Sequence, residues 1–224
     1  ITANDRFLTG GFIYDQIQCP GAGNNFSITN ATINELVYTN TTPALGIIGI
    51  RGGNTIGTLE YKGSAEIRGN NTITNLLLAP SRSYIFRGGT QTINGLFRFI
   101  SPDCSGLGEM RGVDATATLN FGASSTKQIN NVLVENMNAT GTGTPISVNG
   151  ADAGGNTGFT ISSSGSGARY WVGGSGDWND ASHWSATPGG TGGACVPTVA
   201  NDVYFDVNSF TSGSSTVSIQ SGNA

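Results

Sequence analysis

Two short patterns recur in a fixed order between residues 51 and 99, and they constrain the fold more than any other feature of the sequence. One is an apolar residue followed by Arg and Gly, and the other is a strand-like Thr-Ile-x-x-Leu core. The Arg of the turn occurs at Arg51, Arg68 and Arg87, which are 17 and 19 residues apart. The cores begin at Thr55, Thr72 and Thr92. A unit of this length cannot bury its own apolar face, so it must stack on copies of itself.

The stacked strands predict an all-β fold, a right-handed parallel β-helix (solenoid) with rungs of about 17–24 residues. We expect Ile56, Ile73 and Ile93 to form one interior ladder at about 4.8 Å per rung. Residues 32–36 carry the same core, and residues 128–134 are expected to restate it two rungs after Ile93. No window has apolar residues at helical spacing, and the 35 Gly would penalise any helix, so no helix is expected.

Polar residues flank the Ile of each core. The Asn that follows Ile in three of them is expected at a bend, where its amide bonds to the Asn above and below: Asn34, Asn94 and Asn130. The Thr that precedes Ile gives one aligned Thr per rung, at Thr32, Thr55, Thr72 and Thr92, with Gln128 in the later rung. An ice-binding solenoid, a third functional option, needs flat Thr-x-Thr arrays.

A change of composition divides the chain. Residues 1–164 are interpreted as the β-helix rungs of one repeat unit, and residues 165–169 as a Ser/Gly linker. Residues 170–224 are interpreted as a Trp-rich cap with the first strands of the next repeat unit. All three Trp of the chain lie there, Trp171, Trp178 and Trp184, and large rings of this kind suit the capping of an open solenoid end.

Charge and composition exclude several classes of protein. Only 11% of the residues are charged, the net charge is −4, and the two Lys are Lys62 and Lys127, so no basic face is available for nucleic acid. No run of 18 apolar residues exists, and no transmembrane segment is expected. The sequence opens on Ile-Thr-Ala-Asn without an initiator Met or a signal peptide, which favours a fragment of a longer protein.

Three Cys are present, and none has the spacing of a zinc site. On the repeat length above, Cys19 and Cys104 lie about four rungs apart and are too distant for a disulfide. Two alternatives stay open: Cys195 pairs with a residue beyond Ala224, or all three are unpaired thiols.

The Arg of the turns are the first candidate binding site. Arg51, Arg68, Arg87 and Arg111 each precede a Gly and are expected at one corner of successive rungs. Glu66 and Glu109 lie two residues before an Arg, on the same strand face, and are expected to neutralise half of the row. The row is either a binding site for an anionic group or glycan or a solvated, partly paired edge.

Acidic residues in Gly-rich loops are a second candidate. Asp152 with Asn156, and Asp177 with Asp180, offer oxygen ligands of the type that calcium prefers, as do Asp202 and Asp206. The alternative is that these side chains only make turn hydrogen bonds. No other cofactor is expected.

Catalytic arrangements are not apparent. His183 is the only His, so any Ser/His/Asp or Cys/His site has to use it, and a packed or surface role is favoured. The Glu fall at different places in the rungs, so they do not form the carboxylate pair of a glycosidase. We therefore expect a protein that is not an enzyme.

Two long segments carry a family resemblance. RYWVGGSGDWNDASHWS followed by GGACVPTVANDVYFDVNSF resembles the start of repeat units in giant surface proteins of Bacteroidota, including gliding-motility adhesins exported by the type IX secretion system. The part from YIFRGGTQTING to NVLVENMNATGTGTPISVNGADAGGNTGF resembles the end of the preceding unit. A looser likeness exists to the passenger domains of autotransporters.

The resemblance implies tandem β-helical units, an extracellular location at the cell surface and a role in adhesion or gliding. The implied partners are flanking repeat units, the type IX secretion machinery and extracellular polysaccharide or surfaces. The alternative is a fragment of a β-helical carbohydrate-active enzyme whose catalytic residues lie outside this sequence.

Overall fold

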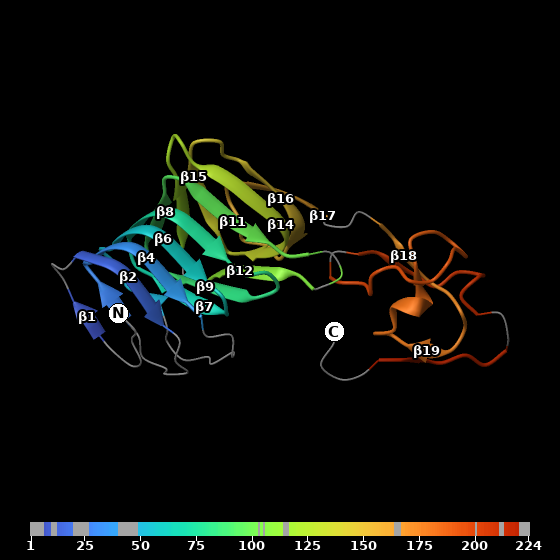
Figure 1. Ribbon diagram of the computed structural model, residues 1–224. Helices are drawn as coiled ribbons and strands as arrows, with labels where there is room; N and C mark the ends of the chain where they lie inside the picture. The colour runs from blue at the N-terminus through green and yellow to red at the C-terminus, as the bar shows by residue number, and fades with distance from the viewer. Residues whose placement is uncertain are drawn as a thin grey trace. The chain divides into compact units, whose positions relative to one another are not determined.

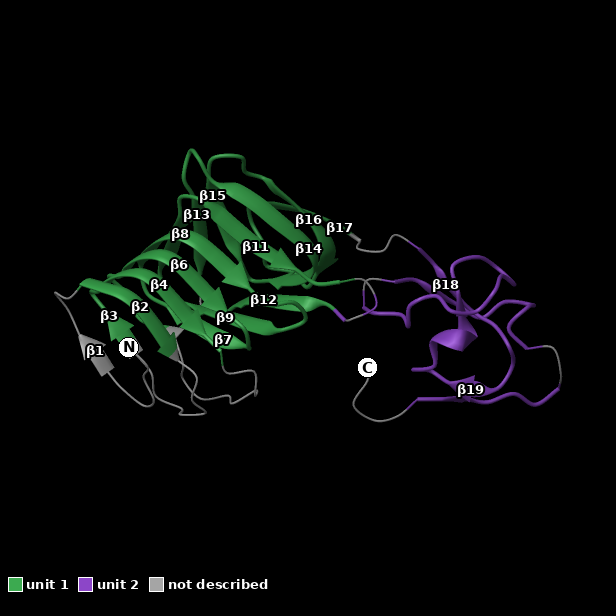
Figure 2. Ribbon diagram, in the orientation of Figure 1, with its two compact units in different colours: residues 1–102, 107–162 green, residues 103–106, 163–224 purple. Residues whose placement is uncertain are grey.

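The computed structural model describes residues 7–9, 13–19, 27–39, 49–102, 104, 106–113, 117–163, 167–199, 201–210 and 213–219. Contacts divide the chain into two compact units (Figure 2). Unit 1 comprises residues 1–102 and 107–162, and unit 2 comprises residues 103–106 and 163–224. The segment 103–106 thus lies in sequence between two strands of unit 1 but packs with unit 2. No helix in the described ranges is long and apolar enough to cross a membrane.

Unit 1 consists of parallel strands, fourteen of them in one curled sheet, while the first, third and fifth strands of the chain form a separate three-stranded sheet (Figure 1). Its strands are β1 (Phe7–Thr9), β2 (Ile13–Cys19), β3 (Ser27–Thr29), β4 (Thr32–Tyr38), β5 (Gly49–Ile50), β6 (Thr55–Tyr61), β7 (Ala65–Arg68), β8 (Asn71–Leu78), β9 (Ser83–Arg87), β10 (Thr90–Ile93), β11 (Leu96–Ile100), β12 (Gly108–Gly112), β13 (Thr118–Phe121), β14 (Thr126–Glu135), β15 (Asn138–Gly141), β16 (Ile146–Asp152) and β17 (Phe159–Ser163). The coarse prediction, an all-β protein with parallel strands, is confirmed.

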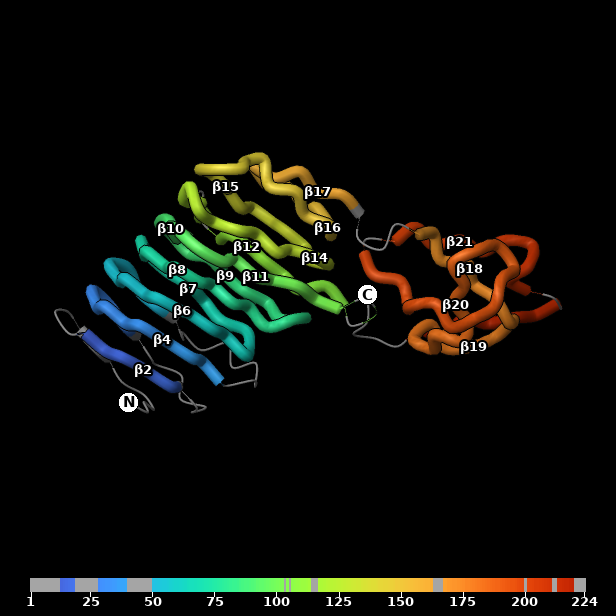
Figure 3. The backbone as a smooth tube through the Cα atoms, turned by 45° about the horizontal axis from the view of Figure 1, so that its top comes forward, coloured from blue at the N-terminus to red at the C-terminus, as the bar shows by residue number. Residues whose placement is uncertain are grey.

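The Thr-Ile-x-x-Leu cores set the register of the stack. β4 pairs with β6, β6 with β8 and β8 with β10, so that Ile33, Ile56, Ile73 and Ile93 are successive partners, followed by Phe121 of β13. All five side chains are buried. Burying an Ile is worth about 1.5–3 kcal/mol, and β-branched residues pack well in strands, so the ladder both stabilises the stack and fixes its register. Figure 3 shows these strands running side by side.

A second set of strands carries the aromatic part of the core. β7 pairs with β9 and β9 with β12, which aligns Ala65, Tyr84 and Met110. The Tyr84 ring packs against Tyr61 and, edge on, against Phe99, at centroid distances of 6.1 and 5.1 Å. Its hydroxyl accepts a 2.8 Å hydrogen bond from the backbone N–H of Ala79, and burial raises the pKa of the phenol. The buried ring therefore has a partner for its one polar atom.

A row of buried amides lines the corner just before three of the cores. Asn54, Asn71 and Gln91 are each at most 3% exposed, and we call them the amide ladder. Asn54 Nδ2 donates to Asn71 Oδ1 at 2.8 Å, and Asn71 Nδ2 donates to Gln91 Oε1 at 2.9 Å. Gln91 Nε2 donates to the Gly69 carbonyl at 2.6 Å. Because each amide satisfies its neighbour, the ladder holds successive turns together without leaving a buried polar group unpaired.

Two predictions about the stack need correction. The Asn that follow Ile do not form one ladder: Asn34 bonds to Asp15 at 3.0 Å, whereas Asn130 accepts a 2.9 Å hydrogen bond from Asn149 of the neighbouring strand, as expected. Residues 128–134 do not restate the core of Ile93: β14 aligns with β11, which makes Ile129 the partner of Phe99. The coil after β10 is longer, and its extra residues shift every later position.

Unit 2 contains short strands and one 3₁₀ turn. The strands are β18 (Arg169–Trp171), β19 (Gly176–Asp177), β20 (Trp184–Ser185), β21 (Val203–Tyr204) and β22 (Val217–Ser218), and the 3₁₀ turn is Ala181–His183. β18 pairs in parallel with β21, and β19 in parallel with β22. Trp171 and Trp184 are fully buried and pack edge to face at 5.0 Å. The 3₁₀ turn is the one helical segment in the described ranges.

Candidate functional site

The Arg row is partly assembled on the β7 and β9 strands. Arg68 and Arg87 are register partners, and both bond through Nε to Glu66 Oε1, the Arg87 contact being 2.7 Å long. Burial alone raises the pKa of Glu66, but the hydrogen bonds and charges of Arg68 and Arg87 outweigh it and lower the pKa. Among the described residues no carboxylate pairs with Arg51, which is exposed on the preceding turn. One Glu therefore pairs with two adjacent members of the row, and the group of three keeps one net positive charge.

Arg111 does not continue this row. Its register partner on β9 is Ile85, two residues before Arg87, and its partner on β14 is Glu135. Arg111 Nε pairs with Glu135 Oε2 at 2.5 Å, so the predicted neutralisation by Glu109 is wrong. Cross-strand pairing brings Glu135 from the next rung, and the sequence spacing of Glu109 does not reveal it.

The acidic candidates make turn hydrogen bonds. Asp152 Oδ1 accepts from Asn156 Nδ2 at 2.7 Å and from the backbone N–H of Gly154 at 2.8 Å. Asp177 accepts from the N–H of Asn179, and Asp180 accepts from the N–H of Ser182. Hydrogen bonding from the Ser182 side chain, and then from its backbone N–H, lowers the pKa of Asp180. In the described part of the chain no three His, Cys, Asp or Glu side chains gather in the manner of a metal site.

The three Trp of unit 2 contact one another in series, and His183 stacks on the first of them. The imidazole stacks on Trp171 at 4.7 Å, and its Nδ1 lies 2.8 Å from the Val172 carbonyl oxygen. Trp184 packs edge to face on Trp178 at 4.8 Å and donates from Nε1 to the Trp178 carbonyl. The His therefore serves as part of an aromatic cluster.

A disulfide joins Cys104 to Cys195 across 91 residues of sequence. Both alternatives drawn from the sequence for Cys195 are therefore wrong. The rung count treated Cys104 as part of the stack, whereas the segment 103–106 packs with unit 2, which already contains Cys195. The side chain of Cys19 lies outside the described residues.

A continuous face of Thr and Asn follows the strands of unit 1 in register. One row consists of partners from β4 to β15: Thr32, Thr55, Thr72, Thr92, Asn120 and Thr140. A second row lies two residues earlier on the later strands: Asn70, Thr90, Thr118, Asn138 and Thr157. We call these eleven residues the Thr/Asn face. Its limit toward the N-terminus is β2, where the partner of Thr32 is the exposed Ile13.

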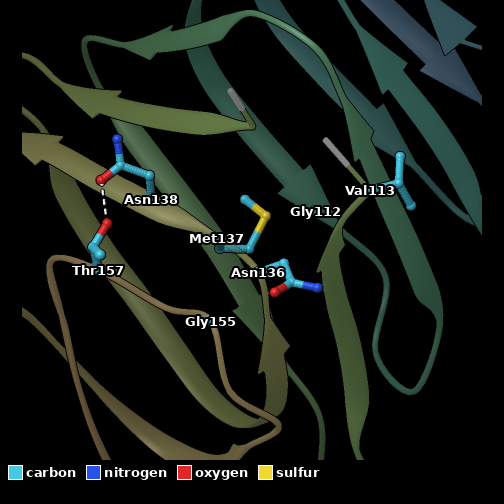
Figure 4. A pocket seen from close by; sticks show the side chains of 7 residues that line it. All are labelled: Gly112, Val113, Asn136, Met137, Asn138, Gly155 and Thr157. Carbon is cyan, nitrogen blue, oxygen red and sulfur yellow. Dashed lines mark hydrogen bonds between the residues drawn. The ribbon is translucent and has the colours of Figure 1, made fainter. Parts of the chain in front are cut away.

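Hydrogen bonds tie neighbouring members of this face to one another. Thr140 Oγ1 donates to Asn120 Oδ1 at 3.1 Å, and Asn138 Nδ2 donates to Thr118 Oγ1 at 3.2 Å. Thr157 Oγ1 donates to Asn138 Oδ1 at 2.5 Å (Figure 4). None of the eleven residues is charged. The face is thus an ordered, uncharged, hydroxyl- and amide-bearing surface.

Two hollows open on or beside the Thr/Asn face. One, of about 430 Å³, is lined by Thr55, Thr72, Thr90 and Thr92 together with Asn and Gly of the adjoining turns. The other, of about 540 Å³, is lined by Asn138 and Thr157 of the face and by Gly112, Val113, Asn136, Met137 and Gly155 (Figure 4). The Thr/Asn face is therefore hollowed at two places along the stack of rungs.

Sequence reasoning missed most of this face, because it identified one aligned Thr per rung. The signal was present as Thr90-x-Thr92, Thr118-x-Asn120 and Asn138-x-Thr140. Comparison with known proteins adds no assignment: no family model, no curated protein and no solved structure matches the chain.

Proposed function

We propose that this chain is a non-enzymatic segment of an extracellular surface adhesin and that the Thr/Asn face is its contact surface. The observation that carries the proposal is the continuity of that face over six strands in register. A surface that repeats from rung to rung suits an extended target, whereas a catalytic centre gathers a few groups around one reacting bond.

The ion pairs support a non-catalytic role. Glu66 is held by two Arg, Glu135 by Arg111 and Glu60 by Lys62. The two Arg lower the pKa of Glu66, which makes this carboxyl a poor general acid at neutral pH. These carboxylates therefore contribute to the surface and the fold rather than to chemistry.

An extracellular location is supported by the Cys104–Cys195 disulfide, because such bonds persist mainly in oxidising compartments. With the resemblance of residues 169–210 to repeat units of gliding-motility adhesins, the disulfide favours export, with the type IX machinery as the expected partner. The parallel pairs β18–β21 and β19–β22 fit the start of a further repeat unit.

In this proposal unit 1 is a right-handed parallel β-helix, each rung of which contributes a member of the face. Stacked rungs have the geometry of a stiff spacer as well as of a binding surface. A flanking repeat unit would add rungs and extend the same face.

Adsorption to solids tests the proposal. The purified chain carrying a fluorescent label is equilibrated with ice, cellulose, chitin and silica, in parallel with a Thr55→Lys/Thr92→Lys variant. We expect the parent to adsorb to at least one solid and the variant to lose most of that adsorption. Release of reducing sugar from a polysaccharide, or equal adsorption of parent and variant on every solid, contradicts the proposal.

A further inference from the structure

We propose that the target of the Thr/Asn face is crystalline water, so that this segment binds ice. The inference rests on the proposed function, since it names the surface to which the adhesin segment attaches. It is drawn from the composition, the spacing and the relief of the face.

Composition argues against the other common targets of such a surface. An anionic glycan needs Arg or Lys, and the face has neither. A single sugar chain is usually held by aromatic rings and by a few converging polar groups in a concave site, and none of the eleven residues is aromatic. A surface without charge and without rings is instead matched to a neutral lattice that offers both hydrogen-bond donors and acceptors, as ice does.

The spacing of residues in the two rows is the second observation that favours ice. Successive rungs lie about 4.8 Å apart, and alternate residues along one strand are about 6.6 Å apart, so the two rows form a rectangular net. Oxygen atoms in an ice surface repeat at distances of this order. The first row continues without a register shift from β4 through β6, β8, β10 and β13 to β15, and the second row accompanies it from Asn70 onward, so the net is coherent over that part of the face.

Thr suits this task for a physical reason. Its hydroxyl donates and accepts hydrogen bonds, while its methyl group orders the water beside it without binding it. Being β-branched, Thr also keeps few rotamers in a strand, so it loses little side-chain entropy on binding. Hydrogen bonds such as Thr140 to Asn120 and Asn138 to Thr118 restrict the face further.

The two hollows are the third observation that favours ice. The hollow on the face is lined by Thr, Asn and Gly, and the one beside it by Asn and Thr together with Val113 and Met137. Hydroxyl and amide groups of this kind are the setting in which a protein holds ordered water. The hollow beside Thr55, Thr72, Thr90 and Thr92 follows the trough between the two rows. Water molecules held there at rung spacing would form the first layer of the lattice that the face joins.

Growth of ice in the presence of the labelled chain tests the inference. A slowly grown ice hemisphere takes up proteins that bind ice and excludes all others. The face variant is Thr55→Lys/Thr92→Lys, and the control is Gln128→Lys/Ser147→Lys, which adds the same charge at exposed positions outside the face. Circular dichroism checks that each variant is folded, and Thr72→Tyr serves as a second, β-favouring face variant.

We expect the parent and the control to enter the ice, and both face variants to be at least tenfold depleted in it. We also expect a gap between the melting and freezing temperatures of crystals held in the parent but not in the face variants. Exclusion of the parent from ice overturns the inference. If the parent is excluded from ice yet adsorbs to cellulose or chitin through the same face, the ice inference fails and the proposed adhesive function stands.

Discussion

Replacing Asn71 with Ala removes the central side chain of the amide ladder and should destabilise unit 1 strongly. Asn71 Nδ2 donates to Gln91 Oε1 and to the Arg68 carbonyl, each at 2.9 Å, and its Oδ1 accepts from Asn54 Nδ2 at 2.8 Å. Asn54 Nδ2 keeps carbonyl acceptors at Ile28 and Arg51, but the backbone N–H of Asn54 loses its 3.3 Å bond to Asn71 Oδ1. The two acceptors that lose the Asn71 amide, at about 1–3 kcal/mol each, alone predict a loss of about 2–6 kcal/mol.

The neighbouring Thr72 provides the matched control. It is exposed, and Thr72→Ala should change the free energy of unfolding by no more than about 0.5 kcal/mol. Urea unfolding followed by far-ultraviolet circular dichroism reports on the strands, most of which belong to unit 1. Equal midpoints for Asn71→Ala and Thr72→Ala would refute the view that the amide ladder holds the corner together.

Three further predictions follow from the core, the charges and the disulfide. Ile73→Ala, in the middle of the interior ladder, should cost about 2–5 kcal/mol in urea unfolding, and a cost below that of Ile13→Ala at the exposed edge would contradict the packing described. The folded-state pKa of Glu66 is lowered, so its stabilisation is present above the pKa of the unfolded chain and is lost as pH falls through the folded value; Glu66→Gln should therefore flatten the acid limb of the stability curve, and an unchanged limb would show that the two Arg contacts contribute nothing. Cys195→Ser should make unit 2 more sensitive to protease than unit 1, since a link closing about 90 residues is worth at most about 4–5 kcal/mol; digestion of both units at unchanged rates would count against it.

The sequence predicted the part of the fold in which the repeat is regular. Thr-Ile-x-x-Leu recurs with short turns between residues 51 and 99, and there apolar periodicity alone aligns Ile56, Ile73 and Ile93. The amide ladder was missed although its signal is visible, because an amide stands directly before the Thr of three cores, at Asn54, Asn71 and Gln91. Its burial follows from the corner geometry, which the strand pattern does not describe.

Beyond Ile100 local patterns stopped predicting register. The excursion at residues 103–106 and the split of one long strand into β10 and β11 change the number of residues per coil. Arg111 and Ile129 therefore lie in segments whose sequence resembles the repeat, but they do not align with the corresponding residues of the earlier rungs. The same excursion brings Cys104 to Cys195, a contact between residues 91 apart that no periodicity encodes.

The candidate site, like the fold, could be predicted from the sequence only in part. The Arg of the turns are conspicuous in a chain with only 11% charged residues, yet two of them share an ion pair with Glu66. The Thr/Asn face consists of residues that are individually ordinary, and only the pairing of the strands joins them into a surface. Parallel register, rather than any single residue, creates it.

Adsorption of two double variants to the solid that the parent binds tests the central claim most directly. Arg51→Gln/Arg87→Gln removes the charges of the Arg row, and Thr55→Lys/Thr92→Lys interrupts the Thr/Asn face. We predict that the Arg variant adsorbs as the parent does and is insensitive to salt, while the Thr variant loses at least nine-tenths of its adsorption. Loss of adsorption in the Arg variant with retention in the Thr variant would contradict the account and assign binding to the Arg row.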